Sequence, residues 1–301
     1  MHRFLVSAAH KSSGKTIISI GLAAVLRQRG LSVAPFKKGP DYIDPMWLEK
    51  ASGSTCWNLD FFTMQRDEIT VCYHRQSQGA DVVLVEGNKG LHDGLDVEGG
   101  DSNAALAKQL DLPVVLVIDV TGITRGIAPL LTGYSAFDPD VGIAGVILNR
   151  VAGPRQENKL RAAIERYTDL PVLGAISRLE GTLIEERHLG LVPAGELAQA
   201  QDCIRAIGRE IENSVNIGQL LHLTAAPAIA APAVSDVEYR SPLDLRIGIA
   251  RDSAFGFYYP DDLDAFAKAG VELVPFDTLR DSALPDVDGL FFGGGFPESF
   301  L

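Results

Sequence analysis

The chain has 301 residues, of which 46% are hydrophobic and 22% are charged, as in soluble globular proteins long enough for more than one domain. The formal net charge of -12 disfavours a nucleic-acid partner, which needs a basic face. Cys56, Cys72 and Cys203 are too few and too widely spaced for a disulfide framework or a C-x-x-C metal site. No apolar run reaches the roughly 18 residues of a membrane span, and no signal pattern is present. We therefore expect a cytoplasmic protein that binds neither membranes nor nucleic acids.

The first apolar run, residues 4–8, leads into Ala-His-Lys-Ser-Ser-Gly-Lys-Thr at 9–16 and then into a predicted helix at 15–28. The segment fits the pattern G-x-x-x-x-G-K-[ST], except that Ala9 stands at the first glycine. A strand that turns through small residues into a helix aims backbone N–H groups at an anion. We predict a nucleotide-phosphate loop in which Lys15 reaches the outer phosphates and Thr16 holds Mg²⁺. The phosphate cradle itself consists of Ser12, Ser13 and Gly14.

Further short runs rich in Val, Ile and Leu follow at 32–36, 81–86, 113–120, 142–149 and 171–176, separated by segments with helical character. Near-continuous apolar strands indicate burial on both faces. The fold class predicted is therefore α/β, with a doubly wound, mostly parallel sheet and helices on both faces. Ligands bind such sheets at the carboxyl edge of the strands.

Two acids, Asp41 and Asp44, follow the second of these strands. Because Gly39, Pro40 and Pro45 flank them, we expect a fixed turn here and no helix. Two carboxylates at the ligand edge can bind Mg²⁺ or orient a nucleophile, and we assign Asp41 to the metal. The preceding Lys37 and Lys38 can face phosphate or a carboxylated substrate, and Lys38 is assigned to the nucleotide. Turn-capping aspartates and solvated lysines are the alternative.

Glu86 ends the third apolar run, which is the usual position of a metal-binding acid in a phosphate-loop enzyme. Asp119 ends the next run and competes for that role, but we expect it to cap a helix or support the site. The loop after Glu86 adds glycines and a further acid, Asp93. His92 in this loop is a candidate base or binding residue, and His188 lies at a later loop–strand junction.

Between about residues 223 and 244 the chain becomes rich in Ala and Pro and poor in charge, which predicts a linker. A strand beginning near 245, a helix near 261–268 and strands at 272–276 and 289–292 follow. This part has fewer than sixty residues, so it is predicted to be the opening of a second α/β domain. The expected division is 1–222, 223–244 and 245–301.

Several segments resemble the cobyrinic acid a,c-diamide synthases, which are ATP-dependent amidotransferases of tetrapyrrole biosynthesis with a dethiobiotin-synthetase-like N-terminal domain. The resemblance covers nearly the whole chain, and its most specific parts are Lys-Gly-Pro-Asp-Tyr-Ile-Asp-Pro at 38–45 and Gly-Gly-Gly-Phe-Pro-Glu at 293–298. Ser-Gly-Lys-Thr at 13–16, Asn-Leu-Asp at 58–60, Gly-Leu-His-Asp-Gly at 90–94 and Asn-Arg-Val at 149–151 also contribute.

The resemblance implies that MgATP phosphorylates a peripheral carboxylate of a tetrapyrrole, cobyrinic acid above all, and that a class I glutaminase domain supplies ammonia to the acyl phosphate. It implies that Lys15, Thr16 and Glu86 serve ATP and Mg²⁺, that Asp44 and Asp93 lie at the reacting centre, and that Asn149 lies beside the adenine. Residues assigned to the macrocycle are Tyr42, Ile43, Asn88, Lys89, Leu91 and His92.

Two departures bear on these expectations. The family's glutaminase cysteine, histidine and glutamate follow the Gly-Gly-Gly-x-Pro-Glu motif at a distance, so we expect this chain to use free ammonia, with glutamine as the donor in a longer enzyme. Asn88 and Lys89 replace residues that are usually apolar, which keeps sirohaem, sirohydrochlorin and its nickel complex open as substrates. A phosphate-loop switch ATPase, a dethiobiotin-type synthetase and a homodimer also remain open.

Overall fold

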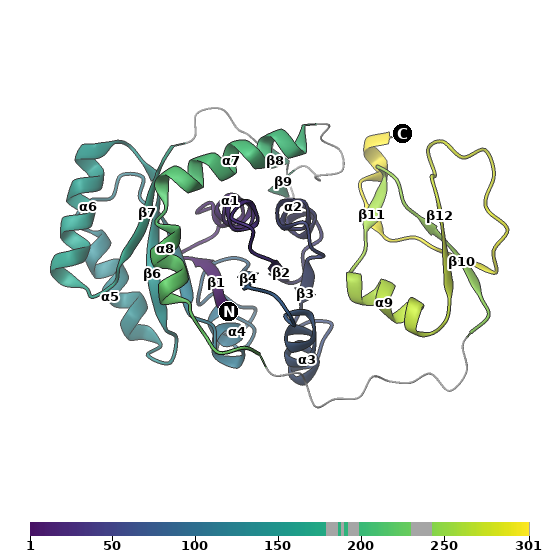
Figure 1. The fold of residues 1–301 in the computed structure, drawn as a ribbon, viewed down its shortest axis with the longest axis horizontal. Coiled ribbons are helices and arrows are strands. Elements are labelled where there is room, and N and C mark those ends of the chain that lie inside the picture. The colour runs from purple at the N-terminus through teal and green to yellow at the C-terminus, as the bar shows by residue number, and fades with distance from the viewer. Residues whose placement is uncertain (179–185, 188–189, 192–198, 230–242, 301) are drawn as a thin grey trace.

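The computed structural model describes residues 1–178, 186–187, 190–191, 199–229 and 243–300. Its main feature is a seven-stranded parallel sheet in the order β3-β2-β4-β1-β5-β6-β7 (Figure 1). The strands are β1 (His2–Ala8), β2 (Val33–Lys38), β3 (Trp57–Leu59), β4 (Val82–Glu86), β5 (Val114–Asp119), β6 (Ile143–Val151) and β7 (Val172–Ser177). The doubly wound α/β class predicted from the apolar runs is confirmed.

Helices cover both faces of this sheet because successive strand residues point to opposite sides. One core contains Phe4 and Val6 of β1, and the other contains Leu5 between them. The first core is closed by α1 (Lys15–Gln28), α2 (Ile43–Ser52), α7 (Ala200–Ser214) and α8 (Ile217–Leu223). The second is closed by α3 (Arg66–Gln76), α4 (Asn103–Gln109), α5 (Ile127–Phe137) and α6 (Pro154–Tyr167).

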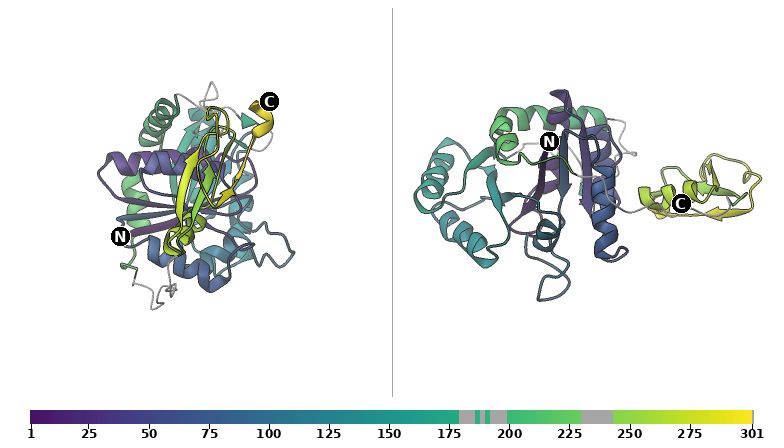
Figure 2. Two further views of the ribbon diagram at one scale, coloured as in Figure 1. Left: turned by 90° about the vertical axis from the view of Figure 1, so that its right-hand side faces the viewer. Right: turned by 60° about the horizontal axis from the view of Figure 1, so that its bottom comes forward.

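Residues 243–300, here called the C-terminal segment, form a three-stranded parallel sheet in the order β12-β10-β13, and Figure 2 shows it beside the larger sheet. Its elements are β10 (Arg246–Ala250), β11 (Phe255–Phe257), α9 (Pro260–Lys268), β12 (Glu272–Phe276), β13 (Gly289–Phe291), β14 (Gly294–Gly295) and a 3-10 helix at Pro297–Phe300. The strands and helix expected here are present. A short antiparallel pair, β8 (Glu186–Arg187) and β9 (Gly190–Leu191), precedes α7.

The expectation of a non-helical stretch through Pro45 is wrong, because α2 begins at Ile43. Proline is tolerated in the first turn of a helix, where its missing N–H has no intrahelical partner to lose. The edge strand β3 was not expected either. It has only three residues, and Asn58 interrupts its apolar character.

Part of the predicted linker packs against the first strand. Thr224 is buried and accepts a backbone hydrogen bond from Arg3, and Ala225 forms an isolated antiparallel bridge with His2. Linker residues 230–242 and His188 lie outside the described residues. In the part of the chain that the structure describes, no helix is long and apolar enough to cross a membrane.

Candidate active site

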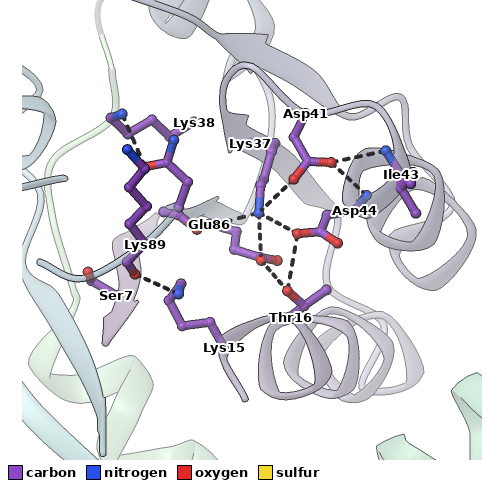
Figure 3. Close-up of polar contacts among 12 residues, drawn as sticks. Ser7, Lys15, Thr16, Lys37, Lys38, Asp41, Ile43, Asp44, Glu86 and Lys89 are labelled. Atoms are coloured by element: carbon purple, nitrogen blue, oxygen red, sulfur yellow. Dashed lines mark hydrogen bonds and ion pairs between the residues drawn. The ribbon is translucent and has the colours of Figure 1, made fainter. Parts of the chain in front are cut away.

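The candidate site is built around a buried lysine at the carboxyl edge of β2 and β4. Lys37 Nζ donates to Asp44 Oδ2 at 2.5 Å and to Glu86 Oε1 at 2.8 Å, and lies 3.5 Å from Asp41 Oδ2 (Figure 3). Thr16 Oγ1, at the start of α1, donates to the same oxygens of Asp44 and Glu86, at 3.1 and 2.8 Å. One cation and three carboxylates therefore meet at the end of the phosphate loop.

Strand register explains this convergence. Lys37 pairs with Glu86 across the parallel strands β2 and β4, so both side chains leave the sheet at the same level. Asp44 follows in the first turn of α2, where a carboxylate is favoured by the helix dipole. Asp41 accepts backbone hydrogen bonds from Ile43 and Asp44 through Oδ1 and so fixes the start of that helix.

Burial and charge shift the pKa values of this cluster in opposite directions. Burial alone would lower the pKa of Lys37, but the charges of Asp44, Glu86 and Asp41 raise it well above its usual value. Burial raises the pKa of Glu86 to about 7, although Lys37 opposes the shift. Burial also raises the pKa of Asp41, whereas the charge and hydrogen bond of Lys37 outweigh burial and lower the pKa of Asp44. Lys37 therefore holds Asp44 ionised.

Lys15 projects from the first turn of α1 towards the loop that follows β4. Its Nζ donates to the carbonyl oxygen of Lys89 at 2.7 Å, and burial lowers its pKa despite the nearby charges of Glu86, Asp44 and Asp93. Asp93 Oδ2 accepts from the backbone N–H of Gly90 at 3.0 Å in the same loop. The structure thus brings Lys15 and the loop after Glu86 together.

The phosphate loop is braced by side chains from two other elements. Asn149, in β6, donates to the carbonyl oxygen of Ser13 at 2.8 Å. Gly14 has a φ of 91°, and a Cβ there would lie 2.2 Å from Asn149 Nδ2, so both backbone conformation and close approach require glycine. Ala9 does not have a positive φ, unlike Ser12 at 64°, and its carbonyl oxygen accepts from the hydroxyl of Tyr134 in α5. The loop therefore needs no glycine at position 9.

A second polar network holds the loop after β4 at residues 87–90. Lys38 Nζ donates to Asn88 Oδ1 at 3.2 Å, and Asn88 Nδ2 donates to the carbonyl oxygen of Gly39 at 3.2 Å. The fully buried Asn103 donates to Ser7 Oγ and to the carbonyl oxygen of Gly90, and accepts from the backbone N–H of Asn88. Burial lowers the pKa of Lys38 to about 8.

The donor set can be compared with the needs of Mg²⁺. Among the described residues, no group of three or more His, Cys, Asp and Glu side chains is arranged to hold a metal ion by itself. Mg²⁺ in phosphoryl-transfer sites usually takes only one or two carboxylates and completes its shell with phosphates and water. Thr16, Asp44 and Glu86 present hard oxygens to one another, and Glu86 Oε2 is buried without a hydrogen-bond partner. These residues fit an ion that arrives with a nucleotide.

Comparison with known proteins agrees with the resemblance seen in the motifs. The family described as "CobQ/CobB/MinD/ParA nucleotide binding domain" matches residues 5–191, and the "CobB/CobQ-like glutamine amidotransferase domain" matches residues 246–301. Proteins called cobyrinate a,c-diamide synthase are similar over almost the whole chain. The protein of Magnetococcus marinus is 50% identical, over 99% of this chain and 65% of its own length. The protein of Methanosarcina acetivorans is 42% identical, over 99% of this chain and 63% of its own length. That of Listeria monocytogenes is 37% identical over 100% of this chain and 67% of its own.

The chain belongs to the cobyrinate a,c-diamide synthase family. It spans about two thirds of the length of these relatives. Among solved structures, the chloroplast FtsY of Physcomitrella patens matches 68% of this chain and 65% of its own, with a TM-score of 0.43 and 19% identity.

In this member of the cobyrinate a,c-diamide synthase family, the residues expected to meet the macrocycle differ in exposure, and Tyr42 is 37% exposed. Leu91 is fully buried in the core, and Ile43 is 8% exposed at the start of α2. Tyr42 is stacked on two aromatic rings of the C-terminal segment. Asn88 and the exposed Lys89 lie beside Lys38 and Lys15, at the edge where the acids gather.

His92 packs against α5. Its ring packs on Tyr134 and Phe137 with centroid separations of 5.5 and 4.8 Å, and burial lowers its pKa. Asp119 accepts from the backbone N–H of Thr121 and pairs with Arg150 at 2.5 Å, as a supporting residue would. Of the two acids that compete for the metal-binding role, Glu86 is the one that Thr16 contacts.

Two residues of the site were not selected from the sequence. Lys37 was expected only to face phosphate or a carboxylated substrate, and Asn103 was not considered. The signal for Lys37 is its strand-end position beside Glu86, which becomes visible once β2 and β4 are known to be neighbours. No sequence pattern marks Asn103, because it acts on a loop that it follows by more than ten residues.

Proposed function

We propose that this chain activates peripheral acetate groups of cobyrinic acid with MgATP and converts them to amides at positions a and c. The observation that carries the proposal is the meeting of Thr16, Asp44 and Glu86 around Lys37 at one edge of the sheet, with Lys15 near enough to feel the charges of Glu86 and Asp44. The printed names of its relatives support cobyrinate as the substrate. The expected donor is ammonia, released from glutamine where a complete glutaminase domain is present.

The chemistry has two steps that balance for each amide. An acetate oxygen of the macrocycle forms a bond to the γ-phosphorus as the bond from that phosphorus to the β–γ bridging oxygen breaks, giving an acyl phosphate and ADP. Ammonia then attacks the acyl carbon, phosphate leaves with the acyl C–O bond electrons, and one proton is lost from nitrogen. Catalysis of the first step is mainly positioning and charge stabilisation.

The chain's own groups are suited to that task. Lys15 would exchange its contact with the Lys89 carbonyl oxygen for the outer phosphates. Lys37 keeps Asp44 ionised and close to Glu86, while Asn149 and Gly14 shape the loop that faces the nucleotide. Mg²⁺, held by Thr16, Glu86 and one or both of Asp41 and Asp44, would neutralise phosphate charge. Asp44 and Asp93 would lie at the reacting centre.

Mass spectrometry tests the proposal. Cobyrinic acid, sirohydrochlorin and sirohaem are each incubated with the chain, MgATP and either ammonium or glutamine. We expect a carboxylate-to-amide mass change for cobyrinic acid with ammonium. Lys15→Ala should abolish product while the circular dichroism spectrum stays unchanged, and Asp44→Asn should lower kcat more than it weakens ATP binding.

Other outcomes would redirect the proposal. Amidation of sirohaem or sirohydrochlorin alone would keep the mechanism and change the substrate. ATP hydrolysis that is independent of every macrocycle, with no amide formed, would favour a switch ATPase instead. A cytoplasmic location and homodimer formation belong to the same proposal, and cell fractionation and light scattering check them.

A further inference from the structure

A single aromatic residue joins the acidic turn to the C-terminal segment. Tyr42 lies between Asp41 and Asp44 and precedes the first residue of α2. Its ring stacks on Phe257 at a centroid separation of 5.6 Å and an interplanar angle of 6°, and on Tyr259 at 4.5 Å and 27°. Three rings thus connect parts of the chain that are more than two hundred residues apart.

Tyr259 also makes a polar contact with the first part of the chain. It is only 6% exposed, and its hydroxyl donates to Asp60 Oδ2 at 3.1 Å. Asp60 directly follows β3, is 1% exposed, and accepts from the backbone N–H of Phe62 through its other oxygen. The hydroxyl therefore satisfies a buried carboxylate that otherwise faces a desolvation cost.

Asp60 in turn packs against the backbone of the acidic turn. A Cβ on Gly39 would lie 2.7 Å from Asp60 Cβ, so the two segments approach as closely as glycine allows. Asn58, also from this strand end, donates to the carbonyl oxygen of Asp41 at 2.7 Å. The turn at residues 39–44 is therefore held on one side by β3 and on another by the C-terminal segment.

The geometry of this turn decides where its carboxylates lie. Asp44 Oδ2 bonds both Lys37 and Thr16, and Asp41 fixes the start of α2 through two backbone hydrogen bonds. A small displacement of Tyr42 would move Asp41 and Asp44 away from Lys37. A displacement of about 1 Å in a reacting group can slow an enzyme reaction about 10²-fold.

We propose that Tyr259 is a positioning residue for the synthetase site: by stacking on Tyr42 and bonding Asp60, it holds the turn that carries Asp41 and Asp44. The C-terminal segment then contributes to carboxylate activation in addition to any part in nitrogen delivery. The proposal rests on the proposed function for its effect on rate, but its structural part does not depend on the substrate.

Two substitutions at this position separate the ring from the hydroxyl. Tyr259→Leu removes both contacts, and Tyr259→Phe keeps the stack. The matched control is Tyr258→Leu, because the Tyr258 hydroxyl bonds Ala250 and Gly293 and its ring packs on Phe291, all within the C-terminal segment. All three are made in the chain as it stands.

Hydrogen exchange measures the structural part without any substrate. We expect the backbone amides of Ile43 and Asp44, which donate to Asp41 Oδ1, to exchange about tenfold faster in Tyr259→Leu than in wild type, while Tyr258→Leu leaves their rate within about twofold. Unchanged exchange in Tyr259→Leu, or equal acceleration in Tyr258→Leu, would overturn the proposal whether or not the chain amidates cobyrinic acid.

Steady-state kinetics with ammonium, MgATP and cobyrinic acid measures the catalytic part. Tyr259→Leu should lower kcat about tenfold with the KM for ATP changed less than about twofold, and Tyr259→Phe should recover most of the rate. An unchanged kcat in Tyr259→Leu, or a loss confined to ATP affinity, would contradict positioning. Absence of amide from the wild-type chain would instead refute the proposed function, and the exchange result would still decide the inference.

Discussion

Lys37 supplies a permanent positive charge to a cluster of carboxylates that would otherwise repel one another. It is 2% exposed and contacts three acids, two of them at 2.8 Å or less. A buried ion pair of this kind adds little net stability, but removing one partner usually costs about 3–5 kcal/mol because the other charge remains buried. Lys37 therefore determines which acids are ionised before a nucleotide binds.

Glu86 should release a proton when MgATP binds. Its pKa is raised to about 7 by burial, so near pH 6.5 much of this carboxyl group is protonated in the nucleotide-free protein. A bound cation favours the carboxylate. We expect calorimetry in two buffers of different ionisation enthalpy to show proton release near pH 6.5 and almost none at pH 8.5.

Glu86→Gln is the control for this measurement, and equal release in that variant would assign the proton to another group.

The raised pKa of Glu86 also makes the stability of the fold depend on pH. Because the folded pKa of about 7 lies above the ordinary value of 4.5, the stabilisation from this group is present below about pH 4.5 and is lost as the pH rises through 7.

The sequence indicates some residues of the site well and others poorly. Lys15, Thr16 and Glu86 follow apolar strands in a recognisable order, so their meeting at one edge can be anticipated. It is Asp44 that bonds Thr16, and this contact depends on α2 starting at Ile43. The sequence does not predict that start, because Pro45 suggests that no helix forms there. Lys37 and Tyr42 owe their surroundings to chain segments distant in sequence, which one-dimensional patterns do not reveal.

At the scale of elements, the contact between α1 and α7 sets how closely the first core packs. Gly21 of α1 faces Ile207 and Ile211 of α7, and a Cβ on Gly21 would lie 2.2 Å from Ile211 Cγ1. Gly208 of α7 also faces α1, but a Cβ there would meet Ala24 Cβ at 3.4 Å, an ordinary contact. Close packing therefore requires glycine at position 21 but leaves room for a methyl group at position 208.

Gly21→Ala should destabilise the protein, whereas Gly208→Ala should not. Alanine gains about 1 kcal/mol in helix propensity at either position, but overpacking a core costs about 1–3 kcal/mol. We expect urea unfolding to show a loss of up to about 2 kcal/mol for Gly21→Ala and a gain of up to about 1 kcal/mol for Gly208→Ala. Equal effects of the two substitutions would show that α7 moves freely to accommodate the added methyl group.

The same physics explains which elements the sequence predicts. Strands buried on both faces give continuous apolar runs, and six of the seven strands of the main sheet were found that way. The seventh, β3, lies at the sheet edge, is short, and uses Asn58 to bind the backbone of Asp41. Its polar residue serves the site, so its sequence does not have the character of a buried strand.

At the scale of the whole molecule, the two sheets differ in how well they are buried. The apolar side chains in the interior of β1 and β4 are fully buried, whereas α9 has no buried residue, and Leu290 in β13 and Phe292 directly after it remain 43% and 48% exposed. Apolar burial is the main source of local stability. The C-terminal segment should therefore open more readily than the main sheet.

Amide exchange of the native chain tests this difference. Residues 246–250 of β10 should exchange at least tenfold faster than residues 82–86 of β4, although both strands are central in their sheets. Equal protection would mean that the contacts through Tyr259 are strong enough to make the two sheets open as one unit.

The phosphate loop has a consequence for how such sites are recognised in new genomes. Ser12 and Gly14 have a left-handed backbone conformation. Ala9, the first residue of the loop, does not, and its carbonyl oxygen accepts a hydrogen bond from the hydroxyl of Tyr134. A text pattern that insists on two glycines would pass over this chain. A pattern weighted by backbone torsion would retain it, and would require glycine only at the position beside Lys15.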